Sequence, residues 1–175
     1  DTNETIISIE QESDEIEETV EENEDSKRVL FVPVENDSTK MISSEINSQN
    51  AILVDYNNSI ISAKKNADDI INPASMTKVL TILVAAKHIE NLDDTVTITQ
   101  EIADYCYKND CSTAGFDVGE TVSIKDLFYG AILPSGGEAA LSLATYVAGS
   151  QDAFVEMMNE EIKELGISDT AHFTN

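Results

Sequence analysis

The sequence has 175 residues, of which 34 are Asp or Glu and only 10 are Lys or Arg, so its formal charge is −24. This charge argues against a nucleic acid or an anionic membrane surface as partner, because phosphate groups would be repelled. The length and a hydrophobic content of 41% allow one ordinary domain, or a smaller domain with a tail. No apolar run approaches the roughly 20 residues that a membrane-spanning helix needs.

The acidity is concentrated at the N-terminus. Residues 1–25 contain 12 acidic side chains and no Lys or Arg, so this seventh of the chain carries half of the net charge. With only five large apolar side chains and no aromatic one, the segment cannot bury enough surface to offset the entropy of ordering. We expect residues 1–28 to be a disordered acidic leader or spacer and residues 29–175 to form the domain. An acidic interaction arm is the alternative.

The first half of the domain reads as strands followed by a long helix. Residues 29–34 predict an edge strand, because Pro33 bars a central position, and residues 35–50 predict a linker or loose helix. Residues 51–56 and 60–63 alternate around the turn 57–59 and predict a hairpin. A polar loop over 66–72 follows. A helix is predicted from Ser75 to about Glu90, and its apolar residues cover so much of the circumference that we expect it to be buried nearly all round.

The second half reads as mainly helical. Val96 and Ile98 alternate as in a strand, and residues 101–121 predict an irregular segment that holds both cysteines. Helices are predicted over 124–133, 137–147 and 151–165, the last ending at Gly166.

The sequence Ser75-Met76-Thr77-Lys78 places a hydroxyl and an amine on one face of a helix start. The helix N-terminus favours developing negative charge, and a serine becomes a good nucleophile when a base takes its proton. Lys78 can be that base if burial lowers its pKa. The alternative from spacing alone is structural, because serine is a common helix N-cap.

The wider context is more specific. Residues 66–81, containing Pro-Ala-Ser-Met-Thr-Lys, resemble the active-serine region of penicillin-binding D-alanyl-D-alanine carboxypeptidases. Residues 118–127 and 129–140 are similar to the segment entering the family's second motif and to that motif. Residues 152–159 and 165–175 are similar to the stretch C-terminal to the second motif in this family. The resemblance runs from about residue 45 to 175 and leaves out the acidic leader.

The sequence departs from the family pattern at two points. The second motif reads Ser135-Gly136-Gly137, with Gly137 where the family usually has Asn. The third motif, Lys-Thr-Gly, does not occur before the sequence stops at Asn175. We therefore expect a domain that lacks its last strands, either as part of a longer protein or as a natural variant, and an inactive 175-residue chain.

The resemblance implies an α+β domain of the β-lactamase and DD-peptidase type, with a helical cluster packed on an antiparallel sheet. It implies a serine carboxypeptidase that removes the terminal D-Ala from peptidoglycan stem peptides and that β-lactams acylate. Ser75 would be the nucleophile, Lys78 the base and Ser135 a proton relay, with Gly136 and Gly137 in the substrate-binding position. No cofactor or metal is implied. The protein would be exported, and any membrane association would reside in parts outside these 175 residues.

Two other functions stay open: a catalytically impaired module that binds cell-wall peptide or regulates, which Gly137 and the absent third motif favour, and a serine β-lactamase. Among the other residues, Cys106 and Cys111 are either a small-loop disulfide or two free thiols. His88 and His172 are expected to be structural or exposed. Glu138 either complements the helix dipole or substitutes for the Asn that the second motif lacks.

Overall fold

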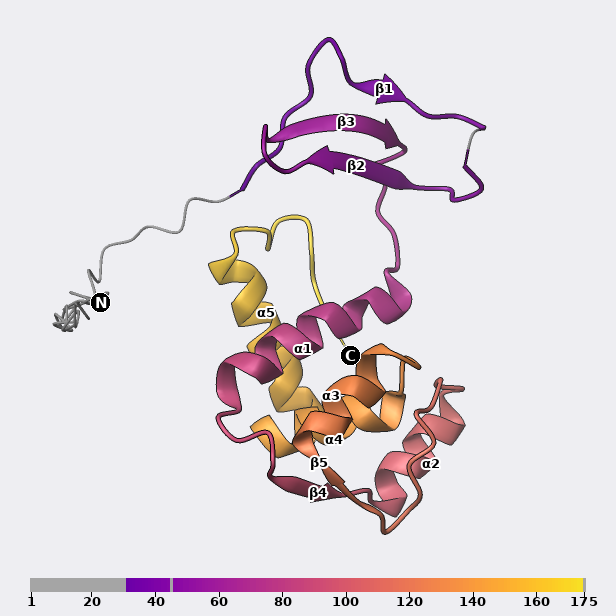
Figure 1. The fold of residues 1–175 in the computed structure, drawn as a ribbon, viewed down its shortest axis with the longest axis vertical. Coiled ribbons are helices and arrows are strands. Elements are labelled where there is room, and N and C mark those ends of the chain that lie inside the picture. Colours follow the sequence, from indigo (N-terminus) through magenta and orange to yellow (C-terminus); the bar gives the residue numbers. More distant parts are fainter. Residues whose placement is uncertain (1–30, 45, 175) are drawn as a thin grey trace, which may run out of the picture.

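The computed structural model describes residues 31–44 and 46–174. The predicted acidic leader and the first two residues of the predicted edge strand lie outside these ranges. The described chain forms a three-stranded sheet and a cluster of five α-helices with a second, two-stranded sheet (Figure 1). The predicted α+β class is confirmed. None of the helices in this part of the chain combines the length and apolarity that crossing a bilayer demands.

The first sheet is built on the predicted hairpin. Strands β2 (Ala51–Asp55) and β3 (Ile60–Lys65) pair in antiparallel fashion. Asp55 fixes the turn between them by accepting hydrogen bonds from the backbone and side-chain nitrogens of Asn58, at 3.1 and 2.8 Å. These bonds favour the ionised carboxylate and lower the pKa of Asp55.

The chain before the hairpin differs from expectation. The segment predicted as a linker or loose helix contains β1 (Lys40–Met41), which pairs parallel to β3 and makes the sheet order β1-β3-β2. In the predicted edge strand, Val34 forms an isolated bridge with Ile60. These pairings satisfy backbone groups with partners 23 or 26 residues away, which local sequence patterns do not reveal.

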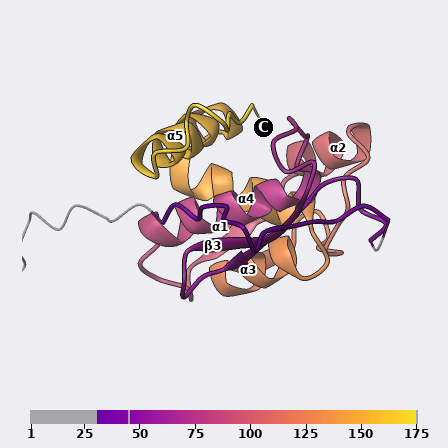
Figure 2. The same cartoon turned by 90° about the horizontal axis from the view of Figure 1, so that it is seen from above.

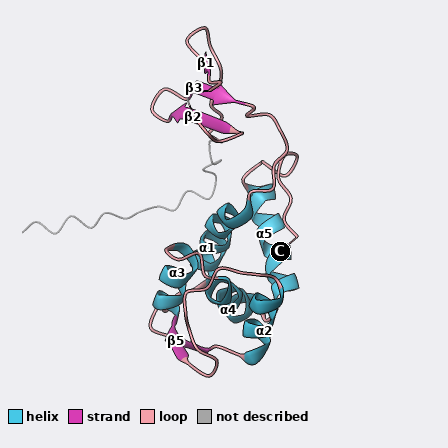
Figure 3. Cartoon of the chain, turned by 90° about the vertical axis from the view of Figure 1, so that its right-hand side faces the viewer, coloured by secondary structure: helices cyan, strands magenta, loops and turns pink. Residues whose placement is uncertain are grey.

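The helices form one hydrophobic core. Helix α1 (Thr77–His88) packs on α3 (Ile124–Ile132), α4 (Gly137–Ala148) and α5 (Gln151–Glu164). Helices α3 and α5 lie on opposite sides of the pair formed by α1 and α4 (Figure 2), and the side view in Figure 3 agrees. Val84, Leu127, Leu143, Phe154 and Met158 are at most 2% exposed at the centre of this core. The helices predicted over 124–133, 137–147 and 151–165 are confirmed.

Helix α2 (Gln100–Lys108) corrects the prediction of an irregular segment over 101–121. The Thr99 side chain caps it by accepting a hydrogen bond from the Ile102 amide. Only Ile102 and Cys106 are buried along this helix. Two apolar positions one helical turn apart are too few to show helical periodicity in the sequence. Strand β4 (Thr95–Thr97) precedes α2 in the chain, β5 (Thr121–Ser123) follows it, and the two strands pair in antiparallel fashion.

Helix α1 is not buried all round, contrary to expectation. Leu80, Thr81, Val84 and Ala85 face the other helices, whereas Val79 is 68% exposed on the opposite side. Leu83 and Met76 are also exposed on that side. The reason is that α3, α4 and α5 pack on α1, whereas the three-stranded sheet is drawn above α1 and apart from it in Figure 1. The apolar residues around α1 therefore divide into a core face and an uncovered face.

Candidate active site

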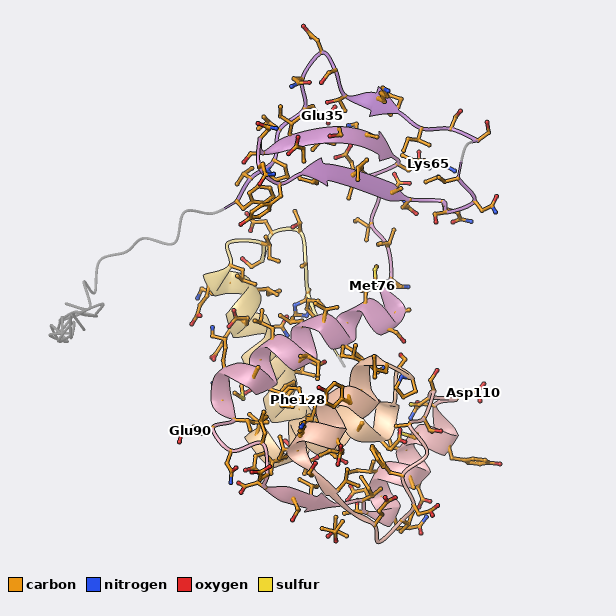
Figure 4. The ribbon with its side chains drawn as sticks, in the orientation of Figure 1. Glu35, Lys65, Met76, Glu90, Asp110 and Phe128 are labelled. Atoms are coloured by element: carbon orange, nitrogen blue, oxygen red, sulfur yellow. The ribbon has the colours of Figure 1, made fainter. Side chains whose placement is uncertain are left out.

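The serine of the first motif lies at a sharply shaped helix start. Pro73 precedes a short 3₁₀ turn, η1 (Ala74–Met76), which runs directly into α1. Ala74 has a φ of +49°, a conformation that costs a residue with a side chain of order 1 kcal/mol or more. This turn presents Ser75 at the surface beside Met76, which Figure 4 labels at the end of α1 nearest the sheet. The Lys78 Nζ lies one turn on, 3.4 Å from the Ser75 hydroxyl oxygen.

The serine of the second motif approaches from the loop between α3 and α4. Ser135 adopts a φ of +64°, which is also unusual for a residue with a side chain. Its hydroxyl lies 2.8 Å from that of Ser75, although sixty positions separate them in the sequence. The structure thus brings Ser75, Lys78 and Ser135 together, with Ser75 in hydrogen-bond contact with both other side chains.

Two glycines fix the backbone behind Ser135. The Gly136 amide donates to the Gly130 carbonyl at 2.8 Å, and the Gly137 amide donates to the Ser112 carbonyl at 2.7 Å. Both glycines are buried, and their two amide hydrogen bonds tie the turn to residues 130 and 112. A Cβ on Gly136 would lie 2.7 Å from the Gly130 carbonyl oxygen, which makes glycine a steric requirement there. A direct substrate contact by Gly136 or Gly137 stays a prediction.

Glu138 makes contacts beside the second motif that the sequence did not reveal. Its side chain is buried, and Oε1 accepts hydrogen bonds from the amides of Ala114 and Gly115 at 2.6 and 2.9 Å. Glu138 thus ties the loop after α2 to the first turn of α4, immediately after the second motif. Oε2 has no hydrogen-bond partner in the described part of the chain. The signal available in the sequence was an acidic residue directly after Ser-Gly-Gly, whose backbone partners lie in a distant loop.

The surroundings of the three side chains are open. Ser75 is exposed, and Lys78 and Ser135 are half-buried. A cavity of about 740 Å³ opens elsewhere, between α2 and the following loop, and is lined by residues that include Cys106, Cys111 and Glu138. His88 and His172 are exposed, and His88 bonds to the Val84 carbonyl of its own helix. Neither histidine is hydrogen-bonded to the serines.

This arrangement has the elements of nucleophilic catalysis. Two hydroxyls and an amine in one hydrogen-bonded group can move a proton away from a serine that attacks a carbonyl, and can return it to a leaving group. Ser75 also lies in a first helical turn, where backbone amides lack intrahelical acceptors and can face a developing oxyanion.

The sequence is similar to a family of known proteins and to individual members of it. The family model for D-alanyl-D-alanine carboxypeptidase matches residues 35–175. The carboxypeptidase DacC of Escherichia coli K12 is 36% identical over 132 residues, which are 70% of this chain and 32% of that protein. The D-alanyl-D-alanine carboxypeptidase of Streptomyces sp. strain K15 is 40% identical over 116 residues, or 62% of this chain and 40% of that protein.

Solved structures show the same likeness. A mutant of the Streptomyces K15 DD-transpeptidase superposes with a TM-score of 0.70 at 29% identity, covering 76% of this chain and 54% of that one. Penicillin binding protein 5 from Haemophilus influenzae gives a TM-score of 0.68 at 31% identity, with 77% and 40% covered. The chain spans about a third of the length of DacC and of the Bacillus subtilis carboxypeptidase DacF. The chain belongs to the D-alanyl-D-alanine carboxypeptidase family.

Proposed function

We propose that the full-length protein carrying this chain is a penicillin-sensitive serine carboxypeptidase that removes the terminal D-Ala from peptidoglycan stem peptides. The observation that carries the proposal is the contact of Ser75 with both Ser135, at 2.8 Å, and Lys78, at 3.4 Å. The family membership and the names of the relatives supply the substrate class.

The proposed reaction has two stages. The Ser75 oxygen attacks the carbonyl of the penultimate D-Ala, while Lys78 in its neutral form accepts the serine proton. Ser135 lies beside Ser75 and passes a proton to the amine of the departing D-Ala. Water then hydrolyses the acyl-enzyme at Ser75. A β-lactam would acylate Ser75 by the same attack on its ring carbonyl.

The proposal places the protein outside the cytoplasm, where peptidoglycan is. The 175 residues contain no Lys-Thr-Gly sequence, the element that by resemblance supplies part of the oxyanion hole and holds the substrate carboxylate. We therefore expect the full-length protein to release D-Ala and the 175-residue chain alone to release none.

The test is release of D-Ala from a peptide that ends in D-Ala-D-Ala, measured on full-length protein. Ser75→Ala should abolish release, whereas Lys78→Met and Ser135→Ala should each reduce kcat by at least about 10²-fold, the range typical of a positioned acid or base. A Ser168→Ala variant, altered at an exposed serine outside the three-residue group, should keep the rate of the unmodified protein. Undiminished release by the Ser75→Ala variant would contradict the proposal.

A module that binds cell-wall peptide without cleaving it is the second candidate. Gly137 favours it, because the Asn amide expected at this position is absent. Saturable binding of the D-Ala-D-Ala peptide by folded full-length protein, with no D-Ala released, would establish that function in place of catalysis.

A further inference from the structure

Two cysteines meet directly behind the second motif. Cys106 lies in the last turns of α2 and Cys111 follows the turn that contains Asp110, which Figure 4 labels. The Cys111 amide donates a hydrogen bond to the Cys106 carbonyl at 3.0 Å, so the two backbones are adjacent. Both are free thiols in the structure.

The two sulfurs also converge on one point. A Cβ built on Gly137 would lie 3.1 Å from the Cys111 sulfur and 3.2 Å from the Cys106 sulfur. The sulfurs therefore occupy the space beside Gly137, into which an asparagine side chain at this position would have to extend. The pair is thus in contact with the turn that carries Ser135.

The environments of the two thiols differ. Burial raises the pKa of Cys106 to about 12, with further contributions from the Cys111 thiol and from Glu138, against a smaller opposing effect of Lys78. Cys111 is half-buried, and both residues line the cavity of about 740 Å³ beside α2. A small oxidant can therefore reach the pair, and Cys111 is the more accessible of the two sulfurs.

We propose that Cys106 and Cys111 are a redox pair whose disulfide pins the loop after α2 beneath the active-site turn. The oxidant is a disulfide, either of a small molecule or of an oxidoreductase. The Cys111 thiolate attacks one sulfur of that disulfide, breaks its S–S bond and expels a thiolate. The Cys106 sulfur loses its proton and attacks the Cys111 sulfur, and this expels the second thiolate. The two cysteines are oxidised by two electrons, and the disulfide is reduced to two thiols.

The bond would act on the second motif through contacts that already exist. The Gly137 amide donates to Ser112, and Glu138 accepts from Ala114 and Gly115, so the loop and the start of α4 are joined just beyond Cys111. Closing the loop from residue 106 to residue 111 removes conformations in which this segment leaves α4. Disulfides persist in oxidising compartments outside the cytoplasm, which is where the proposed function places the protein.

Peptide mapping tests the bond without any measurement of activity. Lys108 lies between the two cysteines, so trypsin separates them into peptides 88–108 and 109–125 unless a disulfide joins them. The protein is equilibrated with oxidised glutathione or with reduced dithiothreitol, alkylated without prior reduction, and digested. We expect the linked pair after oxidation, two alkylated peptides after reduction, and no linked pair from a Cys111→Ser variant. Two alkylated peptides from folded, oxidised protein would overturn the proposal.

Exchange of the Gly137 amide with solvent deuterium, followed by NMR, tests the mechanical consequence. We expect about tenfold slower exchange in the oxidised than in the reduced protein, and no redox dependence in the Cys111→Ser variant. If the Gly137 amide exchanges equally fast in the oxidised protein, with its disulfide formed, and in the reduced protein, the bond forms without holding the turn, which contradicts the anchoring role. Neither readout depends on turnover, so both remain decisive even if the protein cleaves no peptide.

Discussion

Gly137 stands where the family pattern has Asn, and the structure leaves no room for a side chain at this position. A Cβ at this position would lie 2.8 Å from the Cβ of Cys111, a separation that side chains do not tolerate. Cys111 can relieve the clash only by moving its backbone, and its backbone amide is hydrogen-bonded to the Cys106 carbonyl. Overpacking of this kind costs about 1–3 kcal/mol.

The cost is partly offset by helix propensity. Gly137 is the first residue of α4, and replacing a helical glycine with alanine gains up to about 0.5–1 kcal/mol. Gly137→Ala should therefore lower the free energy of unfolding by about 1–2 kcal/mol. For a domain of this size, that corresponds to a fall in Tm of roughly 5 °C.

A double-mutant cycle with Cys111→Gly isolates the contact, because this second change removes both the Cβ and the sulfur on that side. Measured by urea unfolding in the presence of reduced dithiothreitol, Gly137→Ala should be neutral or slightly stabilising in the Cys111→Gly background. If the substitution costs the same in both backgrounds within about 0.5 kcal/mol, the steric reasoning is refuted.

Three further predictions concern the turn and the helix cluster. Ser135→Gly should raise stability by about 1 kcal/mol in thermal unfolding, because glycine relieves the positive φ, yet it should lower kcat for D-Ala release by at least about 10²-fold, as Ser135→Ala should. Glu138→Ala removes the acceptor of the part-buried hydrogen bonds from the Ala114 and Gly115 amides and should cost about 3 kcal/mol in urea unfolding, whereas Glu138→Gln keeps an acceptor oxygen and should cost less. The hydrogen bond from Lys87 to buried Glu161 raises the pKa of Lys87 above its ordinary 10.5, so this stabilisation is complete below that pH and is lost as the pH rises through the folded pKa. The alkaline decline of Tm should flatten in Lys87→Gln, and an unchanged decline would contradict this assignment.

The parts of the fold that the sequence predicts are those with local causes. The hairpin of β2 and β3 follows from alternation around a polar turn, and α3, α4 and α5 follow from helical periodicity. Helix α2 was missed because its buried face consists of Ile102 and Cys106 alone. Strand β1 was missed because its pairing with β3 depends on a distant partner.

The same division holds for the candidate site. Ser75 and Lys78 are one helical turn apart, so sequence spacing alone places them together. Ser135 could be assigned only through the family resemblance, because its contact with Ser75 spans sixty residues and needs a positive φ. The contacts of Glu138 could not be predicted, because its partners are backbone amides, and every residue other than proline has one.

The central claim is that Ser75 is an acylated nucleophile, and a covalent penicillin adduct tests it most directly. Full-length protein is incubated with a fluorescent penicillin, digested with trypsin and analysed by peptide mass spectrometry, with a known penicillin-binding carboxypeptidase as reactive control. We predict one adduct, on peptide 66–78 at Ser75, and none on the Ser75→Ala variant. Folded protein that forms no adduct while the control reacts, or an adduct at another residue, would contradict the account.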